Sequence, residues 1–218
     1  MFNKKLLFVG AAGLAIGLAI GLMNCQNDAK SCRNQGGKLP IVGNRDITSQ
    51  GDTLYPTIRT FTFTNQEGKA ITNHTFQDKI YIVDFFFTSC PTICPKVTAQ
   101  MLRVYERFKN NSNLLLLSHT IDPKRDTPDY LNNYAQKLGI SNAQKWHFVT
   151  GEKDSLYAIA NDYFSIAKED PNTPGGFDHS GRLILVDKAR RVRSFCDGTN
   201  PQEVDCFLRD IETLLKEP

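Results

Sequence analysis

Apolar residues in the body of the chain fall into short runs that are separated by segments with helical spacing. Residues 79–87 (KIYIVDFFF) form the longest run, and its near-continuous apolar character is typical of a strand buried on both faces. Shorter runs of the same kind lie at residues 114–117, 146–149 and 182–186. The spacing predicts helices at residues 95–109, 127–138, 153–164 and 201–216. Alternating strands and helices predict an α/β sandwich with a largely parallel central sheet.

An alternating pattern opens this body. Apolar and polar positions alternate in residues 58–64 (IRTFTFT), and Asn65-Gln66-Glu67-Gly68 follows as a turn, so a hairpin is predicted there. The folded domain is expected to span residues 51–218. Once the first 43 of the 218 residues are set aside, the rest is long enough for one core and too short for two typical domains.

The first 24 residues have a different pattern. Lys4 and Lys5 precede an unbroken run of apolar and small residues at 6–23, which is near the minimum length for a membrane-spanning helix. Lysines in front of such a segment keep the N-terminus in the cytoplasm. The rest of the chain is therefore expected on the extracytoplasmic side of a membrane, which is the periplasmic side in a bacterium.

Cys25 leaves two modes of attachment open. Residues 22–25 (LMNC) resemble a bacterial lipoprotein cleavage site, in which the cysteine becomes the lipidated first residue, although Asn24 is unusual just before the cut. The other interpretation, favoured here, is an uncleaved anchor over residues 1–24. Both attach the domain to a membrane. A polar stretch rich in Gly, Asn and Lys then predicts a flexible spacer over residues 25–50.

Charge and composition argue against several classes of protein. The chain has 26 Lys and Arg against 23 Asp and Glu, a net charge of +3, which is too balanced for a nucleic-acid binder that neutralises phosphates. With 22% charged and 40% hydrophobic residues, the chain does not fit a disordered, collagen-like or coiled-coil protein. No nucleic-acid partner is expected.

Two cysteines stand where the most buried predicted strand ends. Cys90 and Cys94 lie in the sequence CPTICP (residues 90–95), between this strand and the next helix, which is the usual ligand position in open α/β sheets. Pro95 suits the first helical position, which makes Cys94 the predicted N-cap. Because amides at a helix start stabilise negative charge, we expect Cys94 to have a lowered thiol pKa and to be a good ligand and nucleophile.

A metal site needs a further ligand, and the chain has four histidines. His179 is the best candidate because it lies where a loop rich in turn residues meets the strand at 182–186. His74, His119 and His147 are interpreted as packed or surface residues. The sequence by itself leaves the choice among the four open.

Three motifs together resemble the Sco/SenC family. They are CPTICP at residues 90–95, IDPKRDTP at 121–128 and Asp178-His179-Ser180, and they occur in the family's order. Members of this family are membrane-tethered, thioredoxin-fold proteins that bind copper and assist assembly of the copper centre of cytochrome c oxidase. The resemblance covers residues 56 to 215 or so. It implies a thioredoxin-like three-layer sandwich with a central mixed sheet and an N-terminal hairpin extension.

The resemblance also implies a site and partners. Cys90, Cys94 and His179 are the implied copper ligands, for Cu(I) or Cu(II). The implied partner is the cytochrome c oxidase subunit that carries a copper centre, with another copper chaperone or a thiol reductase as further candidates. Two thiolates and one imidazole also suit copper on chemical grounds, whereas zinc prefers a fourth ligand.

Two other functions are weighed against copper delivery. Thiol-disulfide exchange through Cys90 and Cys94 is the alternative, because a cysteine pair at a helix start is also typical of thioredoxin-like reductases. However, three residues separate these cysteines, where the thioredoxin-like motif has two. A peroxidase ranks third, since Val83 and Phe87 stand where the peroxiredoxin pattern needs Pro and Thr or Ser. The chain is therefore predicted to be a metallochaperone rather than an enzyme.

Further features fall outside the three-part motif. The segment before His179, residues 173–177 (TPGGF), is richer in glycine than is expected for the family. Cys196 and Cys206 are extra, and they are predicted either to form a disulfide or to be two buried thiols. Thr127 is predicted to cap a helix that begins at Pro128, with Asp126 placed favourably near its N-terminus.

Overall fold

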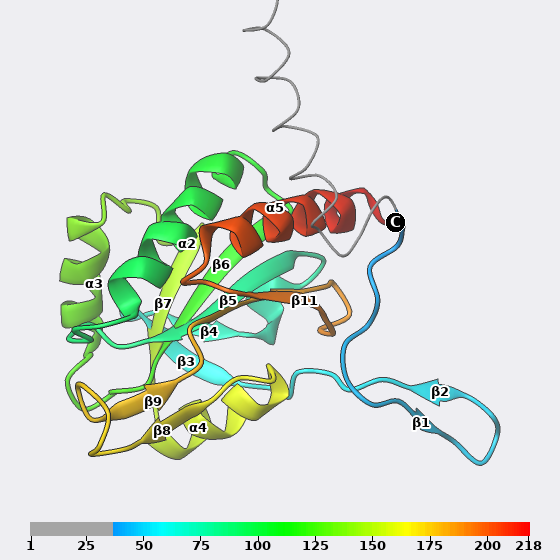
Figure 1. The fold of residues 1–218 in the computed structure, drawn as a ribbon, viewed down its shortest axis with the longest axis horizontal. Helices are drawn as coiled ribbons and strands as arrows, with labels where there is room; N and C mark the ends of the chain where they lie inside the picture. The colour runs from blue at the N-terminus through cyan, green and yellow to red at the C-terminus, as the bar shows by residue number, and fades with distance from the viewer. Residues whose placement is uncertain (1–36) are drawn as a thin grey trace, which may run out of the picture. The chain divides into compact units, whose positions relative to one another are not determined.

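The sheet at the centre of the structure has seven strands in the spatial order β11-β10-β5-β6-β7-β3-β4 (Figure 1). In chain order these are β3 (Thr62–Asn65), β4 (Ala70–Thr72), β5 (Ile80–Phe86), β6 (Leu114–Thr120), β7 (Trp146–Thr150), β10 (Arg182–Val186) and β11 (Val192–Asp197). The structure is a computed structural model that describes residues 37–218. The predictions for the anchor at 1–24, for Cys25 and for the first part of the spacer lie outside the described residues. Within residues 37–218, no helix combines the length and the apolar character needed to cross a membrane.

Only the middle of this sheet is parallel. β5 pairs with β6, and β6 with β7, in parallel, while the pairs of β10 with β5 and with β11, and of β3 with β7 and with β4, are antiparallel. The central mixed sheet is therefore confirmed. The largely parallel sheet predicted from the alternation of elements is wrong at both edges, because β3–β4 and β10–β11 are hairpins that reverse the chain. The hairpin predicted around the 65–68 turn is β3–β4, and β3 joins it directly to the central sheet.

Helices cover both faces of the sheet, as alternate side chains of β5 show. Phe85 packs on Tyr163, next to the end of α4 (Lys153–Asp162), with ring centroids 5.9 Å apart. Phe86 faces the other way and stacks on Tyr134 of α3 (Pro128–Lys137) at 5.4 Å. The described chain therefore forms the expected three-layer α/β sandwich.

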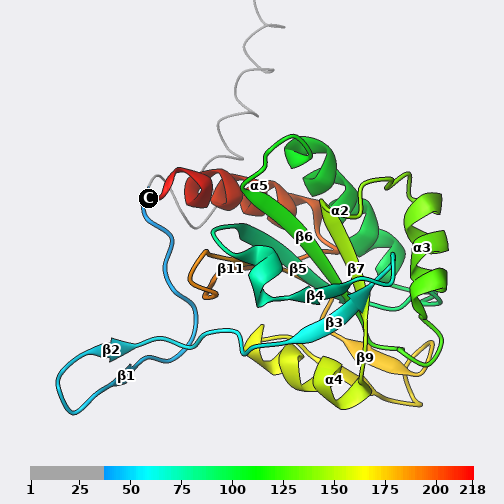
Figure 2. The same cartoon turned by 180° about the vertical axis from the view of Figure 1, so that it is seen from behind.

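Three helices share the α3 side of the sheet. The Tyr134 hydroxyl lies 3.0 Å from the hydroxyl of Thr98 in α2 (Cys94–Phe108), which places α2 beside α3. Ion pairs at 2.5 Å, between Arg103 and Asp205 and between Arg107 and Glu212, join α2 to α5 (Pro201–Lys216). Figures 1 and 2 show α4 across the sheet from α2 and α5. Both α2 and α5 bury an apolar stripe against the sheet, with side chains such as Met101 and Ile211 fully buried.

Caps set the starts of two helices. The hydroxyl of Thr127 accepts a hydrogen bond from the amide of Tyr130 at 3.4 Å, and Pro128 is the first residue of α3, as predicted. Asn200 caps α5 by accepting from the amides of Gln202 and Glu203. The predicted bounds of the four helices thus agree with the structure to within two residues at each end.

One end of the sheet is closed by a buried ionic group that we call the Arg193 cluster. The guanidinium of Arg193 in β11 is 3% exposed and pairs with Glu217 at 2.7 Å and with Asp187 at 3.2 Å. It also donates to the backbone carbonyl oxygens of Leu39 and Pro40. The cluster therefore binds residues 39–40 and the end of α5 to the same strand.

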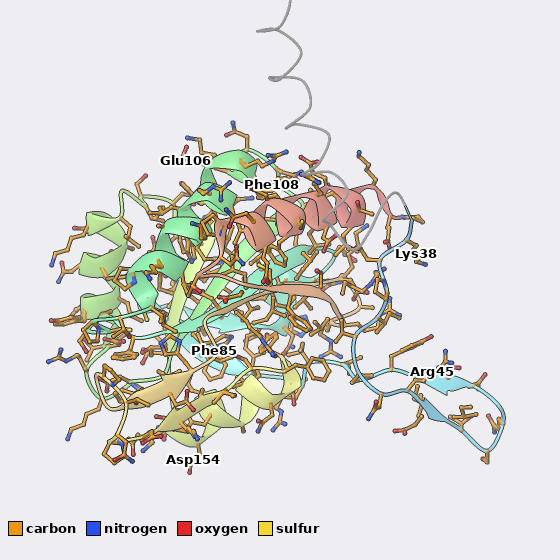
Figure 3. The ribbon with its side chains drawn as sticks, viewed as in Figure 1. Lys38, Arg45, Phe85, Glu106, Phe108 and Asp154 are labelled. Atoms are coloured by element: carbon orange, nitrogen blue, oxygen red, sulfur yellow. The ribbon has the colours of Figure 1, made fainter. Side chains whose placement is uncertain are left out.

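A short arm follows this anchored segment. It is a separate two-stranded sheet of β1 (Asp46–Ile47) and β2 (Thr53–Leu54), whose residues are all exposed. Figure 3 shows Arg45 on this arm, whereas Phe85 lies inside the body. Because the strands have two residues each and no buried face, the sequence contains no periodic signal that predicts them. Part of this arm comes from residues expected to be spacer.

Candidate metal centre

The three residues expected to bind a metal meet in the structure. Nε2 of His179 lies 3.5 Å from Sγ of Cys94 and 3.9 Å from Sγ of Cys90. The three candidate ligand atoms all lie within 4.8 Å of one another, and all three residues are buried. Among residues 37–218, no other histidine, cysteine or acidic residue joins this group. The cluster thus offers two sulfurs and one nitrogen.

Three separate elements supply these side chains. β5 ends at Phe86, Cys90 lies in the loop that follows, and α2 begins at Cys94. His179 is the last residue of β9 (Phe177–His179), which pairs with β8 (Ala167–Glu169) in a hairpin outside the central sheet. The loop after β5 lies at the edge where the parallel strands end, and a second segment of the chain can approach it there. In this structure that segment is the β8–β9 hairpin.

The start of α2 differs from the prediction. Ile93, not Cys94, is the N-cap, Cys94 is the first helical residue, and Pro95 follows it. The amide of Cys94 donates to Sγ of Cys90 at 3.5 Å. The free amide at the helix start therefore donates a hydrogen bond to the sulfur of Cys90 and not to that of Cys94.

The two thiols are consequently unequal. Burial raises the pKa of the Cys90 thiol, but hydrogen bonds from the amides of Cys94 and Thr92 and from both side chains outweigh it, so that this pKa is lowered. Burial raises the pKa of the Cys94 thiol far above its ordinary value, and the nearby Cys90 and Asp84 add to the rise. The predicted low pKa of Cys94 is therefore wrong, because burial outweighs the helix start at that position. Cys90 is the thiol that ionises first.

His179 is held mainly by packing. Burial lowers its pKa, an effect that the Asp178 carboxylate and a hydrogen bond to the backbone of Phe85 partly oppose, so the imidazole is neutral at pH 7. Its ring lies edge-on to the ring of Phe87, with centroids 5.8 Å apart. Nδ1 is buried, and no side chain in the described part of the chain forms a hydrogen bond with it. A neutral imidazole can offer its Nε2 lone pair to a metal ion that lies between it and the sulfurs.

The other three histidines lie outside the cluster. His119 is fully buried beside the rings of Phe63 and Phe85, and burial lowers its pKa to about 3. His147 is 5% exposed, and burial lowers its pKa to about 4. His74 is exposed in the short helix Asn73–Phe76. These three agree with their interpretation as packed or surface residues.

Asp126 is a supporting residue whose contacts the sequence reasoning missed. Its carboxylate is fully buried and accepts hydrogen bonds from the amide of Thr88 at 3.1 Å, from the Thr88 hydroxyl at 2.5 Å and from the Thr120 hydroxyl at 2.5 Å. Thr88 is two residues before Cys90, so Asp126 fixes the approach to the cysteine loop. The only signal in the sequence is that Asp126 falls inside the 121–128 motif and that Thr88 lies just before the 90–95 motif.

A second buried carboxylate lies in β5 itself. Asp84 accepts a hydrogen bond from the hydroxyl of Ser118, which in turn accepts one from Nε1 of Trp146 at 2.8 Å. Burial raises the pKa of Asp84 to about 7. This chain of three polar groups crosses from β5 through β6 to β7 beneath the cysteine loop.

Cys196 and Cys206 do not form a disulfide with each other. Cys196 in β11 is a free thiol and is 5% exposed. Cys90 and Cys94 are also free. The two cysteines of the cluster are therefore in the reduced form that metal binding requires.

Comparisons with known proteins agree with this geometry. Residues 50–216 match the SCO1/SenC family. The chain is 28% identical to the SCO1 protein homolog of Bacillus subtilis over 164 residues, which is 74% of this chain and 84% of that protein.

Solved structures of similar proteins have the same fold. BsSco, a member of the Sco family of cytochrome c oxidase assembly proteins in which a disulfide switch was identified, superposes with a TM-score of 0.65 at 27% identity, covering 74% of this chain and 95% of that one. Bradyrhizobium japonicum ScoI, solved with copper bound, superposes with a TM-score of 0.55 at 25% identity, covering 70% and 98%.

Proposed function

Because this chain belongs to the SCO1/SenC family, we propose that Cys90, Cys94 and His179 bind copper and that the protein delivers it to, or assists maturation of, the copper centre of cytochrome c oxidase. The observation that carries the proposal is the distance from Nε2 of His179 to the two sulfurs, 3.5 and 3.9 Å. Bonds of about 2.0 Å to nitrogen and 2.3 Å to sulfur place ligand atoms about 3.5–3.8 Å apart around a shared ion. The nitrogen–sulfur distances therefore already suit a shared ion, and the two sulfurs lie within 4.8 Å of each other.

The donor set favours copper over zinc. Thiolates suit Cu(I), and imidazole suits Cu(II), so two sulfurs and one nitrogen can hold copper in both oxidation states. A structural zinc ion would take a fourth protein ligand, and no other candidate side chain joins the cluster within residues 37–218. Three ligands also leave one side of the ion open, which favours transfer to an acceptor.

Binding releases protons in a set order. Cys90 ionises first because its sulfur accepts hydrogen bonds from two backbone amides. Cys94 is protonated until an ion arrives, because burial and the neighbouring negative charge raise its pKa. We infer that Cys90 captures the ion and that Cys94 and His179 complete the site.

Thiol-disulfide exchange is the second candidate function. The observation in its favour is the unequal pair of thiols, since a low-pKa cysteine beside a protonated one is typical of a nucleophilic and a resolving cysteine. Oxidation of this pair would remove both sulfur ligands. The two activities are therefore exclusive in any one molecule at one time.

Removal of single ligands tests the proposal on the reduced full chain. Wild type mixed with CuCl₂ is expected to bind one copper per chain with intense thiolate-to-copper absorption, and Cys90→Ser to lose that absorption. Cys196→Ser is the matched control, since it removes a buried free thiol outside the cluster. Equal absorption in Cys90→Ser and wild type would place the copper site elsewhere.

His179→Ala separates the two functions. Copper delivery needs the imidazole, whereas exchange needs only the thiols, so this variant should lose copper affinity by more than about 100-fold and still form the Cys90–Cys94 disulfide. His74→Ala, which removes an exposed histidine, should change neither property. Native copper affinity with loss of oxidoreductase turnover in His179→Ala would favour the exchange function.

We also propose that the domain is anchored to a membrane and faces away from the cytoplasm, which the Lys4/Lys5 and 6–23 pattern supports. Mass spectrometry of the N-terminus of the membrane-bound protein distinguishes the two modes of attachment. An intact Met1 indicates a spanning anchor, and a diacylglyceryl group on Cys25 indicates lipoprotein processing. A protein recovered in the cytoplasm would contradict both.

A further inference from the structure

The hairpin that contains His179 has a tip with its own hydrogen bonds. The tip joins β8 to β9 through residues 170–176. The amide of Gly176 donates to the carbonyl oxygen of Thr173 at 2.9 Å, and the amide of Asp170 donates to that of Gly176 at 2.9 Å. These bonds hold the tip together but do not fix where the hairpin lies relative to the cysteine loop.

Phe87 is the surface on which the hairpin rests. The ring of Phe177 packs on it with centroids 4.9 Å apart, and His179 lies edge-on to it at 5.8 Å. The backbone of Gly175 comes closer still. A Cβ added at Gly175 would lie 2.8 and 2.9 Å from Cζ and Cε2 of Phe87 and 3.3 Å from Cδ of Pro91. Only a residue without a side chain can approach the ring in this way.

The neighbouring glycine provides a natural comparison. Gly175 and Gly176 have φ angles of +88° and +83°, so both occupy the left-handed region that favours glycine. A Cβ added at Gly176 would meet nothing within 4 Å. The two positions therefore impose the same backbone requirement, but only at Gly175 would a side chain collide with its neighbours.

We propose that Gly175 is a positioning residue for the metal centre. Its missing side chain lets the β8–β9 hairpin close on Phe87 and Pro91. This closure places His179 against the sulfurs and shields Cys90 and Cys94, which are 8% and 4% exposed. Packing has this role because no side chain within residues 37–218 forms a hydrogen bond with Nδ1 of His179, and the pairing of His179 with Ala167 lies within the hairpin itself. The consequence for copper rests on the proposed function, whereas the closure is a property of the metal-free chain.

The first test measures closure without any metal. The reduced, metal-free full chain is treated with N-ethylmaleimide at fixed pH, and the labelling of the Cys90 and Cys94 peptides is followed by mass spectrometry. Gly175→Ala should label about tenfold faster than wild type, because the closed hairpin becomes a minor state, while Gly176→Ala should stay within about twofold. Equal labelling rates in the two variants, both folded by circular dichroism, would overturn the proposal.

A second variant tests the contact itself. Phe87→Leu removes both ring atoms that the added Cβ would meet. The double variant Phe87→Leu/Gly175→Ala should therefore label within about twofold of Phe87→Leu alone, since the steric conflict is gone. This comparison decides the matter even where Gly175→Ala alone does not fold. A further tenfold rise in the double variant would show that Phe87 is not the contact, and would also overturn the proposal.

Copper binding supplies an independent readout. In competition with bathocuproine disulfonate for Cu(I), Gly175→Ala should bind about tenfold more weakly than wild type, and Gly176→Ala within about twofold. Wild type that binds no copper would contradict the proposed function but leave the labelling difference standing. Labelling rates that do not separate the two glycines would contradict the role of Gly175 and leave copper binding intact.

Discussion

The two ends of the central sheet bury polar groups in opposite ways. At the Arg193 cluster, the guanidinium meets Glu217 at 2.7 Å and Asp187 at 3.2 Å, and it donates to two backbone carbonyl oxygens as well. At the metal centre, His179 meets the sulfurs at 3.5 and 3.9 Å, and no side chain within residues 37–218 forms a hydrogen bond with its Nδ1. One end is satisfied by the chain itself. The other leaves ligand atoms free for a cargo.

This difference separates stability from binding. A buried charge that loses its partner costs several kcal/mol, so stability depends on every member of the Arg193 cluster being present. Free thiols and a neutral imidazole cost much less to bury, because none of them is charged. The fold can therefore stay intact while the metal centre is empty or full, as the proposed role in copper delivery requires.

The largest effect is expected at the Arg193 cluster. Arg193→Met leaves Asp187 and Glu217 without their buried partner and should lower the free energy of unfolding by about 3–5 kcal/mol. Urea titration followed by circular dichroism measures this. Arg191→Met is the control, since Arg191 pairs with Asp187 from a position that is 31% exposed and should cost under about 1 kcal/mol. The comparison fails if the two variants lose the same stability.

Asp84, which lies near the metal centre, should make the free energy of unfolding depend on pH. Burial raises its pKa from 3.8 to about 7, so the folded chain binds this proton more tightly than the unfolded chain. Protonated Asp84 therefore makes its full contribution to the free energy of unfolding below about pH 4. This contribution is lost as the pH rises toward 7.

Asp84→Asn removes this loss, because an amide does not ionise. At pH 8 it should be more stable than wild type by about 2–4 kcal/mol, with a flatter stability curve between pH 4 and 7. Asp46→Asn, at an exposed position on the β1–β2 arm, should leave the curve unchanged. An unchanged curve in Asp84→Asn would mean that Asp84 is not the group responsible.

Asp126 should affect both stability and the cysteines. Asp126→Ala leaves the amide and hydroxyl of Thr88 and the hydroxyl of Thr120 without an acceptor, which should cost about 1–3 kcal/mol. Labelling of Cys90 by N-ethylmaleimide should also become faster, because Thr88 leads into the cysteine loop. Asp122→Ala is the control from the same motif, since within residues 37–218 its carboxylate accepts a single hydrogen bond, of 3.4 Å, from the amide of Arg125. Equal labelling in the two variants would argue against a supporting role for Asp126.

The smallest effect is expected at the surface of the hairpin. Lys168 pairs with Asp178 at 3.3 Å, next to His179, but both side chains are more than a third exposed. Lys168→Ala should change the free energy of unfolding by less than about 0.5 kcal/mol. The Cu(I) affinity should also stay within about twofold of wild type. A larger loss would mean that charge, rather than packing on Phe87, holds the hairpin.

The features predicted from the sequence are those with a local signal. The apolar run of β5, the turn at 65–68 and the cap at Thr127 each depend on a few neighbouring residues, and each agrees with the structure. The two short hairpins, β1–β2 and β8–β9, were not predictable in this way. Their strands have only two or three residues, which is too short for a hydrophobic period to form.

At the metal centre, the sequence locates the residues but not their states. Cys90 and Cys94 are recognisable from their place after β5, whereas His179 could be chosen only through the family motifs. The pKa of Cys94 was predicted wrongly because burial outweighs the helix start at that position, and the amide there points at the sulfur of Cys90. The contact of Asp126 with Thr88 spans 38 residues and exists only once β5 and β6 are side by side. These outcomes depend on tertiary packing.

Trp146 is the single tryptophan of the chain, and its place in the core makes it a built-in optical probe. Its indole donates to Ser118, which donates to Asp84, so the charge on that carboxylate lies two hydrogen bonds from the fluorophore. The emission spectrum should therefore shift as Asp84 titrates, with a midpoint at about pH 7. Fluorescence recorded on the unlabelled protein then reports the core beneath the cysteine loop, with no contribution from the Arg193 end.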